Sequence, residues 1–503
     1  MFRPMFRRTV FALTLLLVTP LQALAERVAL VIGMGDYQNV AQLKNTINDA
    51  DKIAAKLQEV GFNVTLATNK SQAELLDILQ TFSFQAETAD LALVYYAGHG
   101  VEVQGVNYLV PVDAKVAKAE DITRVGISLN QILKAVESAR KMRVVILDSC
   151  RNNPFIGIKG FDAAGDTSLS GNTSDPNAAP QGLAPVNPEL GTLVAYAAKA
   201  GQVALDGLGG NSPYASALVE AFGKPDVEIG LMFRQVRDDV LKNTGNLQEP
   251  YQYGSLSGTP FYLAGNTEGS IDIAAEADPK VAWAHIKPDQ EQQMQAMAEG
   301  GDTRALLGLA YIRLNPDQAS YNPEEAVKFL TKAADAGAAD SQYELAKLYE
   351  KGLGVPADPV KALALYQAAA DQGLADAVND LGFLYYQGGL GIDPDQAKAL
   401  EYFKKAADLR QPEAMFNYAG LIDEGQVPGE GPEDAAKYLY SALRSGSEQV
   451  LTQMTTRPNM FKQPARKALQ KILKEHSFYT GPLDGNFGKT TTVAIKKAFG
   501  LAG

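Results

Sequence analysis

The stretch Arg143-Val144-Val145-Ile146-Leu147-Asp148-Ser149-Cys150-Arg151-Asn152 contains the only cysteine of the 503-residue chain. Residues 143–147 have the short, β-branched character of a buried strand, and the polar residues that follow indicate a loop. A second run of this kind, residues 91–97, ends at Gly98-His99-Gly100, so that His99 lies 51 positions before Cys150. Because catalytic groups of open α/β sheets lie beyond the carboxyl ends of the strands, we expect the thiol and the imidazole at one edge of one sheet.

Cysteine and histidine also have ordinary structural interpretations. A single cysteine is often a small buried apolar residue, and a single histidine is often a hydrogen-bonded polar one. The chain has three histidines, and His285 and His476 lie in segments that read as a linker and a separate small domain. His99 is therefore the imidazole that can act as a general base for a Cys150 thiolate nucleophile. Ser149 is a weaker nucleophile candidate, because no convincing Asp–His pair accompanies it.

Strands and helices alternate along residues 27–263, which predicts a parallel sheet with helices on both faces. Strands are expected at 27–33, 63–67, 91–97, 143–147, 192–197 and 260–263, and helices at 50–60, from 71, and at 129–139, 212–222 and 231–243. Asn48 and Asp49 are expected to cap the first helix, and Ser71 opens a capping box at the second. Residues 101–111 read as a hairpin.

The first 25 residues read as a secretory signal peptide. Arg3, Arg7 and Arg8 supply positive charge, the apolar core is too short to span a bilayer, and Ala23-Leu24-Ala25 fits a cleavage site. The mature chain is then exported, with no transmembrane anchor after signal removal. A lone cysteine in an oxidising compartment cannot form an intramolecular disulfide, which supports a free catalytic thiol. The net charge of −12 argues against nucleic acid as a partner.

Residues 302–447 contain an internal repeat of two helices joined by a Gly/Pro turn. Similar helices end at intervals of 36, 37 and 36 residues, at Gly337, Gly373, Arg410 and Gly446. This period predicts an α-solenoid, in which stacking of helix pairs supplies the core. The turns at 350–355 and 386–392 resemble those of the Sel-one-like branch of the tetratricopeptide repeats. The resemblance implies a protein partner on the concave face, and a rigid spacer is the alternative.

Two further segments flank the repeats. Residues 264–301 read as a partly helical linker that contains the only tryptophan, Trp283. Residues 460–503 read as a small helical domain with a Gly/Asp turn at 479–488. This segment resembles the peptidoglycan-binding domain of envelope proteins, which implies a periplasmic or cell-envelope location and peptidoglycan as a partner. A structural cap on the solenoid is the alternative.

The first domain resembles the caspase–metacaspase family over about residues 27–263. The motif carriers are the His-Gly pair after a strand, the later Asp148-Ser149-Cys150, and Arg151-Asn152-Asn153-Pro154-Phe155, which is typical of the bacterial branch. The caspase signature Gln-Ala-Cys is absent. The resemblance implies a six-stranded sheet, Cys150 as the nucleophile and His99 as the base. The N–H groups of Gly100 and Cys150 are the expected oxyanion donors.

The acidic residues expected in the substrate pocket predict which substrate side chain the protein prefers. Asp148 stands where caspases have a pocket glutamine, Asp49 resembles a metacaspase residue that lines the primary pocket, and Asp206 falls near a caspase pocket arginine. An acidic pocket suits arginine or lysine. The ordinary alternatives are a helix cap for Asp49 and a hydrogen bond at a strand end for Asp148.

The sequence therefore predicts an exported cysteine endopeptidase that cleaves polypeptides after Arg or Lys. No metal site and no cofactor are expected, and calcium activation stays open. Residues 152–190 read as a mobile loop, and self-processing is a hypothesis for this loop or for Arg151. Two other functions stay open: a noncatalytic scaffold that acts through its repeats, and a hydrolase that cuts cell-wall peptides.

Overall fold

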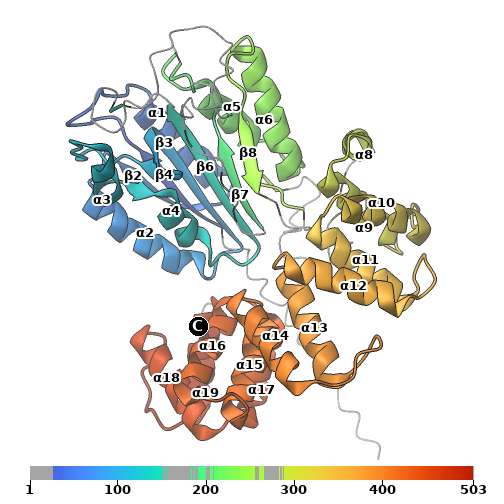
Figure 1. The fold of residues 1–503 in the computed structure, drawn as a ribbon. Helices are drawn as coiled ribbons and strands as arrows, with labels where there is room; N and C mark the ends of the chain where they lie inside the picture. The colour runs from blue at the N-terminus through green and yellow to red at the C-terminus, as the bar shows by residue number, and fades with distance from the viewer. Residues whose placement is uncertain are drawn as a thin grey trace, which may run out of the picture.

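The computed structural model describes residues 27–150, 154–155, 183, 186, 188, 191–199, 204–207, 209–254, 256, 260–265, 283, 286 and 288–501. The predicted signal peptide, Arg151 and almost all of the predicted loop at 152–190 lie outside the described residues. Figure 1 shows a sheet domain, coloured blue to green, and a helical repeat region, coloured yellow to red, that lies against it. The described part of the sheet domain ends at residue 265, and the description resumes at Trp283.

Six strands form the main path of the sheet, in the order β2-β1-β3-β6-β7-β8. The parallel strands are β1 (Arg27–Gly33), β2 (Asn63–Thr68), β3 (Leu91–Val103), β6 (Met142–Cys150) and β7 (Thr192–Tyr196). The edge strand β8 (Tyr251–Gly254) runs antiparallel to β7. The hairpin predicted over 101–111 is confirmed by the antiparallel pairing of β4 (Val106–Leu109) with β3, and β5 (Ile127–Ser128) pairs with β4.

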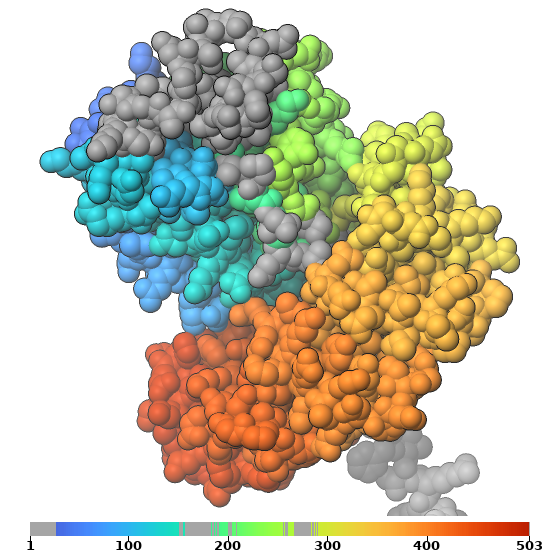
Figure 2. Space-filling view, viewed as in Figure 1, coloured from blue at the N-terminus to red at the C-terminus, as the bar shows by residue number. Residues whose placement is uncertain are grey.

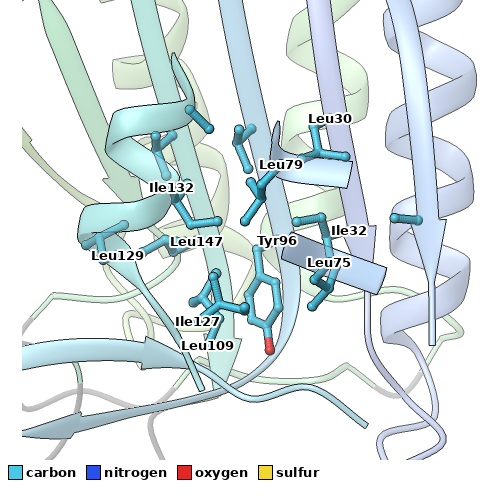
Figure 3. Close-up of a cluster of buried hydrophobic side chains, with 14 of the residues drawn as sticks. Leu30, Ile32, Leu75, Leu79, Tyr96, Leu109, Ile127, Leu129, Ile132 and Leu147 are labelled. Atoms are coloured by element: carbon cyan, nitrogen blue, oxygen red, sulfur yellow. The ribbon is translucent and has the colours of Figure 1, made fainter. Parts of the chain in front are cut away.

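Helices cover both faces of the sheet, as predicted (Figure 1). One face packs against α1 (Thr46–Glu59), α5 (Pro213–Phe222) and α6 (Ile229–Asn243), and the other against α2 (Gln72–Ala86) and α4 (Leu129–Val136), with the short α3 (Ile122–Val125) nearby. Alternate residues of each strand feed the two apolar cores. Figure 3 shows the second core, where strand residues such as Leu30, Ile32 and Leu147 meet Leu75 and Leu79 of α2 and Leu129 and Ile132 of α4.

Two predictions about the strands are wrong. Residues 260–263 are not a strand, because only Tyr262 forms an isolated bridge, to Glu228, and Pro260 has no N–H to give to a ladder. The last strand is instead β8, whose side chains are largely exposed and therefore leave no apolar run in the sequence. In addition, β3 and β6 continue beyond residues 97 and 147, so that His99 and Cys150 lie within strands rather than in loops.

The first helix also differs from its prediction. It begins at Thr46, four residues earlier than expected, with Asn45 at the N-cap position and no side-chain cap. Asn48 and Asp49 therefore lie in the first turn of α1 and do not cap it. The capping box at Ser71 is confirmed, because its hydroxyl accepts from the N–H of Glu74 while the Glu74 carboxylate accepts from the N–H of Ser71.

The repeat region contains four helix pairs that stack into a solenoid. The pairs are α9 (Thr303–Leu314) with α10 (Pro323–Asp335), α11 (Ala339–Lys351) with α12 (Pro359–Asp371), α13 (Ala375–Gln387) with α14 (Gln396–Asp408), and α15 (Pro412–Glu424) with α16 (Pro432–Arg444). The residues that close the second helices have φ values of +89°, +83°, +64° and +84°, at Gly337, Gly373, Arg410 and Gly446. Arg410 thus adopts the left-handed conformation that glycine takes in the other repeats, which confirms the predicted equivalence.

The segments that flank the solenoid pack onto it. Trp283 is 2% exposed and shares a core with the first repeat and its neighbour α8 (Pro288–Glu299). At the other end, α17 (Glu448–Thr456), α18 (Gln463–Glu475) and α19 (Lys489–Phe499) share one apolar core with α15 and α16. None of the helices in the described part of the chain has the length and hydropathy needed to cross a bilayer.

Two arginines fasten the end of the repeat region to the sheet domain. Arg444 is 4% exposed, and its guanidinium donates to the carboxylate of Glu87 (2.9 Å) and to the carbonyl of Phe84 (3.0 Å). Arg140 of the sheet domain donates in return to the carbonyls of Arg444 (3.0 Å) and Phe499 (2.5 Å). The space-filling view shows the repeats in continuous contact with the sheet domain on this side (Figure 2).

Candidate active site

His99 and Cys150 are register partners on neighbouring parallel strands. The pairing of β3 with β6 runs without a break from Leu91 with Met142 to His99 with Cys150. Neighbouring strands lie about 4.8 Å apart, so the backbones of the two residues are side by side at the carboxyl ends of the strands. The structure thus brings the two predicted dyad residues to one edge of the sheet.

The imidazole of His99 is held in one tautomer. Its Nε2 lies 2.8 Å from the carbonyl oxygen of Ala41, and a carbonyl can only accept, so Nε2 carries the proton and Nδ1 does not. Nδ1 is buried and has no hydrogen-bond partner among the residues that the structure describes. Burial lowers the pKa of His99, with the Ala41 hydrogen bond acting in the opposite direction. The ring is therefore neutral near pH 7 and offers an unused lone pair at Nδ1, as a general base requires.

Two tyrosines hold the main chain of His99. The His99 N–H donates to the hydroxyl of Tyr37 (2.8 Å), and the hydroxyl of Tyr96 donates to the His99 carbonyl (2.7 Å). The Tyr37 ring also contacts the imidazole, with 4.6 Å between the ring centroids. Gly98 makes room for this arrangement, because a Cβ there would lie 2.6 Å and 2.7 Å from the two hydroxyl oxygens.

Gly100 and Ser149 lie directly beside the dyad positions. A Cβ at Gly100 would lie 2.9 Å from the Ser149 Oγ, so the position has no room for a side chain. Ser149 is 3% exposed, and its hydroxyl has no hydrogen-bond partner within the described part of the chain. Because side chains alternate along a strand, Ser149 projects to the face opposite that of Asp148. No base lies beside its hydroxyl among the described side chains.

Asp49 and Asp148 form a buried pair of carboxyl groups that share one serine. Asp49 is 1% exposed and accepts from the Asn211 side chain (2.7 Å) and the Ser212 N–H (3.0 Å). Asp148 is 7% exposed and accepts from the Ser212 hydroxyl (2.6 Å) and the Tyr95 hydroxyl (3.0 Å). Ser212 is also the N-cap of α5, so the start of this helix fixes the positions of both carboxyl groups.

Asp206 completes a cluster of three acidic groups. Burial raises the pKa of Asp49 to about 6, and burial together with the charge of Asp49 raises the pKa of Asp148 to about 7. The charge of Asp206 contributes to both of these raised pKa values, and burial raises the pKa of Asp206 itself against the opposing effect of Lys44. The three predicted pocket residues are thus close enough to interact. Asp206 is the one that is half-buried rather than buried.

No metal centre is found in the described ranges, where no three His, Cys, Asp or Glu side chains gather in a way that could hold an ion.

Comparison with known proteins agrees with this architecture. Residues 26–262 match the family model described as the Caspase domain. Four segments match the Sel1 repeat: residues 303–337, 339–374, 375–410 and 412–447. The chain carries a caspase-like domain followed by Sel1 repeats.

Two curated relatives each match one quarter or less of the chain. Human mucosa-associated lymphoid tissue lymphoma translocation protein 1 is 30% identical over 128 residues, which are 25% of this chain and 15% of that protein. The exopolysaccharide production negative regulator of Rhizobium leguminosarum bv. viciae is 34% identical over 136 residues, which are 24% of this chain and 51% of the regulator. The chain therefore spans at most about half of these relatives.

Two solved structures show weak similarity to parts of the chain. The Drosophila initiator caspase Dronc has a TM-score of 0.32 at 14% identity, over 45% of this chain and 78% of Dronc. A Sel1 repeat protein from Oxalobacter formigenes has a TM-score of 0.33 at 18% identity, over 42% of this chain and 90% of that protein.

Several residues around the candidate site of the caspase-like domain were missed from the sequence. Tyr37 and Ala41 lie in the aperiodic segment after β1, and Ala41 contributes only a backbone carbonyl, which no side-chain motif reveals. Tyr95 reads as one more apolar residue of a buried strand. Ser212 was predicted only as the start of a helix, although a serine before a helix with a proline at its first position is a recognisable N-cap.

Proposed function

We propose that the caspase-like domain is a cysteine endopeptidase that cleaves after arginine or lysine. The observation that carries this proposal is the register pairing of His99 with Cys150, combined with an imidazole whose proton is fixed on Nε2 by Ala41. A neutral imidazole with a free Nδ1 can take the proton of a thiol, and the resulting thiolate attacks the carbonyl carbon of the scissile bond. The same ring then protonates the leaving amine.

The oxyanion that forms in this reaction needs nearby N–H donors, and we assign this role to Gly100 and Cys150. Gly100 follows His99 along β3, and Cys150 lies opposite His99 on β6. A Cβ at position 100 would lie 2.9 Å from the Ser149 Oγ, so glycine is needed for the main chain to pass here. Preorganised backbone donors of this kind typically contribute about 3 kcal/mol to transition-state stabilisation.

The acidic cluster supports the basic specificity. Asp49 and Asp148 are buried and already hydrogen-bonded, whereas Asp206 retains exposed surface. A substrate guanidinium or ammonium group would therefore contact Asp206 directly and be attracted by the two charges beneath it. Negative charge in a low-dielectric site acts strongly on a cation because water screens it poorly.

A fluorogenic peptide assay tests the proposal. The native protein should cleave peptides with arginine or lysine before the scissile bond, under reducing conditions and with and without calcium. Cys150→Ala should abolish cleavage, and His99→Gln should reduce kcat by roughly three orders of magnitude or more. Absence of cleavage by the native protein in all of these conditions would instead indicate a noncatalytic caspase-like scaffold.

Export and partner binding form a second part of the proposal. We infer that residues 1–25 direct export to the periplasm or envelope, that the Sel1 repeats bind a protein partner, and that residues 460–503 contact peptidoglycan. Sel1 repeats typically mediate contacts between proteins, which supports the second of these inferences. N-terminal sequencing of the mature chain tests export, and sedimentation with purified cell walls tests peptidoglycan binding.

Mass spectrometry of active protein tests self-processing at Arg151 or in residues 152–190, because an intact active chain would exclude it.

A further inference from the structure

The backbone of His99 is enclosed in a ring of hydrogen bonds. The His99 N–H donates to the Tyr37 oxygen (2.8 Å), the Tyr37 and Tyr96 hydroxyl oxygens are 3.4 Å apart, and the Tyr96 hydroxyl donates to the His99 carbonyl (2.7 Å). Because the proton of Tyr96 is directed to the carbonyl, Tyr37 can be the donor between the two hydroxyls. All members are buried, where hydrogen bonds strengthen one another and water does not compete. Tyr96 projects from the apolar cluster of Figure 3, with its hydroxyl at the far end of the ring.

This ring of hydrogen bonds lies where the sheet itself stops supporting β3 on one side. The pairing of β1 with β3 ends at Gly33 and Ala97, two residues before His99. An amide beyond the end of a neighbouring strand loses its ladder partner and must find another one. Tyr37, four residues after Gly33, supplies that partner. On this side of β3 the N–H of His99 is therefore held by a side chain, whereas the pairing with β6 continues to Cys150.

The segment that carries Tyr37 also holds the imidazole. The Tyr37 ring contacts the imidazole at a centroid distance of 4.6 Å and an interplanar angle of 47°, and Ala41 accepts from Nε2. Tyr37 and Ala41 are four residues apart, so one short segment grips the backbone N–H, the ring face and the ring N–H of His99. Rotation of the His99 imidazole would therefore break its hydrogen bond to Ala41 or bring it into collision with the Tyr37 ring.

We propose that Tyr37 is a positioning residue for His99, supported by Tyr96, and that it fixes the orientation of the imidazole and therefore of its Nδ1. This inference rests on the proposed function. In this role Tyr37 contacts neither the substrate nor the thiol, and it acts only through His99. Displacement of a catalytic group by about 1 Å can cost a hundredfold in rate. The effect of losing the hydroxyl should therefore appear in kcat and in the reactivity of Cys150, and not in substrate affinity.

Alkylation of Cys150 provides a measurement that does not depend on proteolysis. Cys150 is the only cysteine in the chain, so iodoacetamide labelling followed by mass spectrometry reports on one thiol. Only the thiolate reacts, and a well-placed imidazole makes it available below the ordinary thiol pKa. The native protein should be alkylated faster at about pH 6.5 than His99→Gln. Tyr37→Phe keeps the ring and removes the hydroxyl, and its alkylation profile should shift toward that of His99→Gln.

Kinetics and a matched control complete the test. Tyr37→Phe should lower kcat by roughly 10- to 100-fold with KM changed less than about twofold, and Tyr96→Phe should act in the same direction. Tyr262→Phe is the control, because Tyr262 is also buried in this domain but its hydroxyl has no hydrogen-bond partner in the described structure. It should leave kcat and the alkylation profile unchanged.

The possible outcomes separate this inference from the proposed function. If the native protein cleaves no peptide, the alkylation profiles still test the role of Tyr37, because they need only the thiol and the imidazole. If Tyr37→Phe melts below the assay temperature, Tyr96→Phe decides. The inference would be overturned if Tyr37→Phe and Tyr96→Phe both kept the alkylation profile and the kcat of the native protein. It would also be overturned if the native protein had the same alkylation profile as His99→Gln.

Discussion

Asp49 and Asp148 are joined through Ser212, which donates its N–H to the first carboxyl group and its hydroxyl to the second. The shared partner keeps the two acids close together, and burial raises their pKa values to about 6 and about 7. Both groups therefore lose negative charge as the pH falls through neutrality. The charge that attracts a basic side chain weakens over the same range.

Recognition of an arginine substrate should depend on pH. KM for an arginine peptide should rise as the pH falls from about 8 to about 5, because the raised pKa values place protonation of Asp148 and then Asp49 in that range. The same peptide with neutral citrulline in place of arginine should show no such rise. Steady-state kinetics at closely spaced pH values check this, and an equal rise for both peptides would contradict it.

Stability should respond to the same burial. The folded-state pKa of Asp148 is raised from 3.8 to about 7, so the cost of ionising this buried group is absent below about pH 4 and complete above about pH 7. Asp148→Asn keeps an oxygen acceptor for Ser212 and Tyr95 and removes the charge. It should stabilise the protein by roughly 1–3 kcal/mol at about pH 8 and change little at about pH 4. Thermal melts at both pH values check this, with the surface variant Asp434→Asn as the control that should not stabilise at pH 8.

Gly98 should tolerate no side chain. A Cβ would lie within 2.8 Å of the hydroxyl groups of Tyr37 and Tyr96, so Gly98→Ala should push them away from His99. We expect kcat to fall by at least roughly tenfold, because the base is displaced. Gly420→Ala is the matched control, since nothing lies within 4 Å of its Cβ and the position is helical. That control should keep full activity and gain up to about 1 kcal/mol of stability.

The contact between Arg444 and Glu87 should be worth much more than a surface ion pair. Arg444→Met leaves a half-buried carboxylate without its partner, so unfolding in urea should show a loss of roughly 2–4 kcal/mol. Lys437→Met on the same helix breaks the exposed pair with Asp434 and should cost less than about 1 kcal/mol. A double-mutant cycle with Glu87→Gln isolates the pairwise energy. If Arg444→Met and Lys437→Met lost the same free energy of unfolding, the burial of Arg444 would add nothing to the strength of its ion pair.

The sequence was informative where side-chain pattern and structure coincide. Apolar runs revealed β3 and β6, and the polar residues at their ends revealed His99 and Cys150. The helical period revealed the solenoid and the equivalence of Arg410 with the glycines that close the other repeats. Asp49, Asp148 and Asp206 were named together through a family resemblance, and the structure places them close enough to interact although they come from three separate segments.

Other features could not be predicted because no local pattern encodes them. Every residue has a backbone carbonyl, so only the fold shows that the one of Ala41 lies beside the imidazole of His99. Strand β8 has exposed side chains and carries no apolar signal. Arg444 and Glu87 are 357 positions apart, and the local sequence around either residue does not indicate that the two are in contact.

The two arginine contacts at the end of the repeat region have a mechanical consequence. Glu87 precedes β3 and Arg140 precedes β6, so the last repeat is bound to the segments that lead into the two strands that carry His99 and Cys150. A partner that levered α16 away would have to hydrate a guanidinium that is now 4% exposed, and that cost would be subtracted from its affinity. Removal of α16 would thus release Glu87 and Arg140, which lie just before the two strands that carry His99 and Cys150.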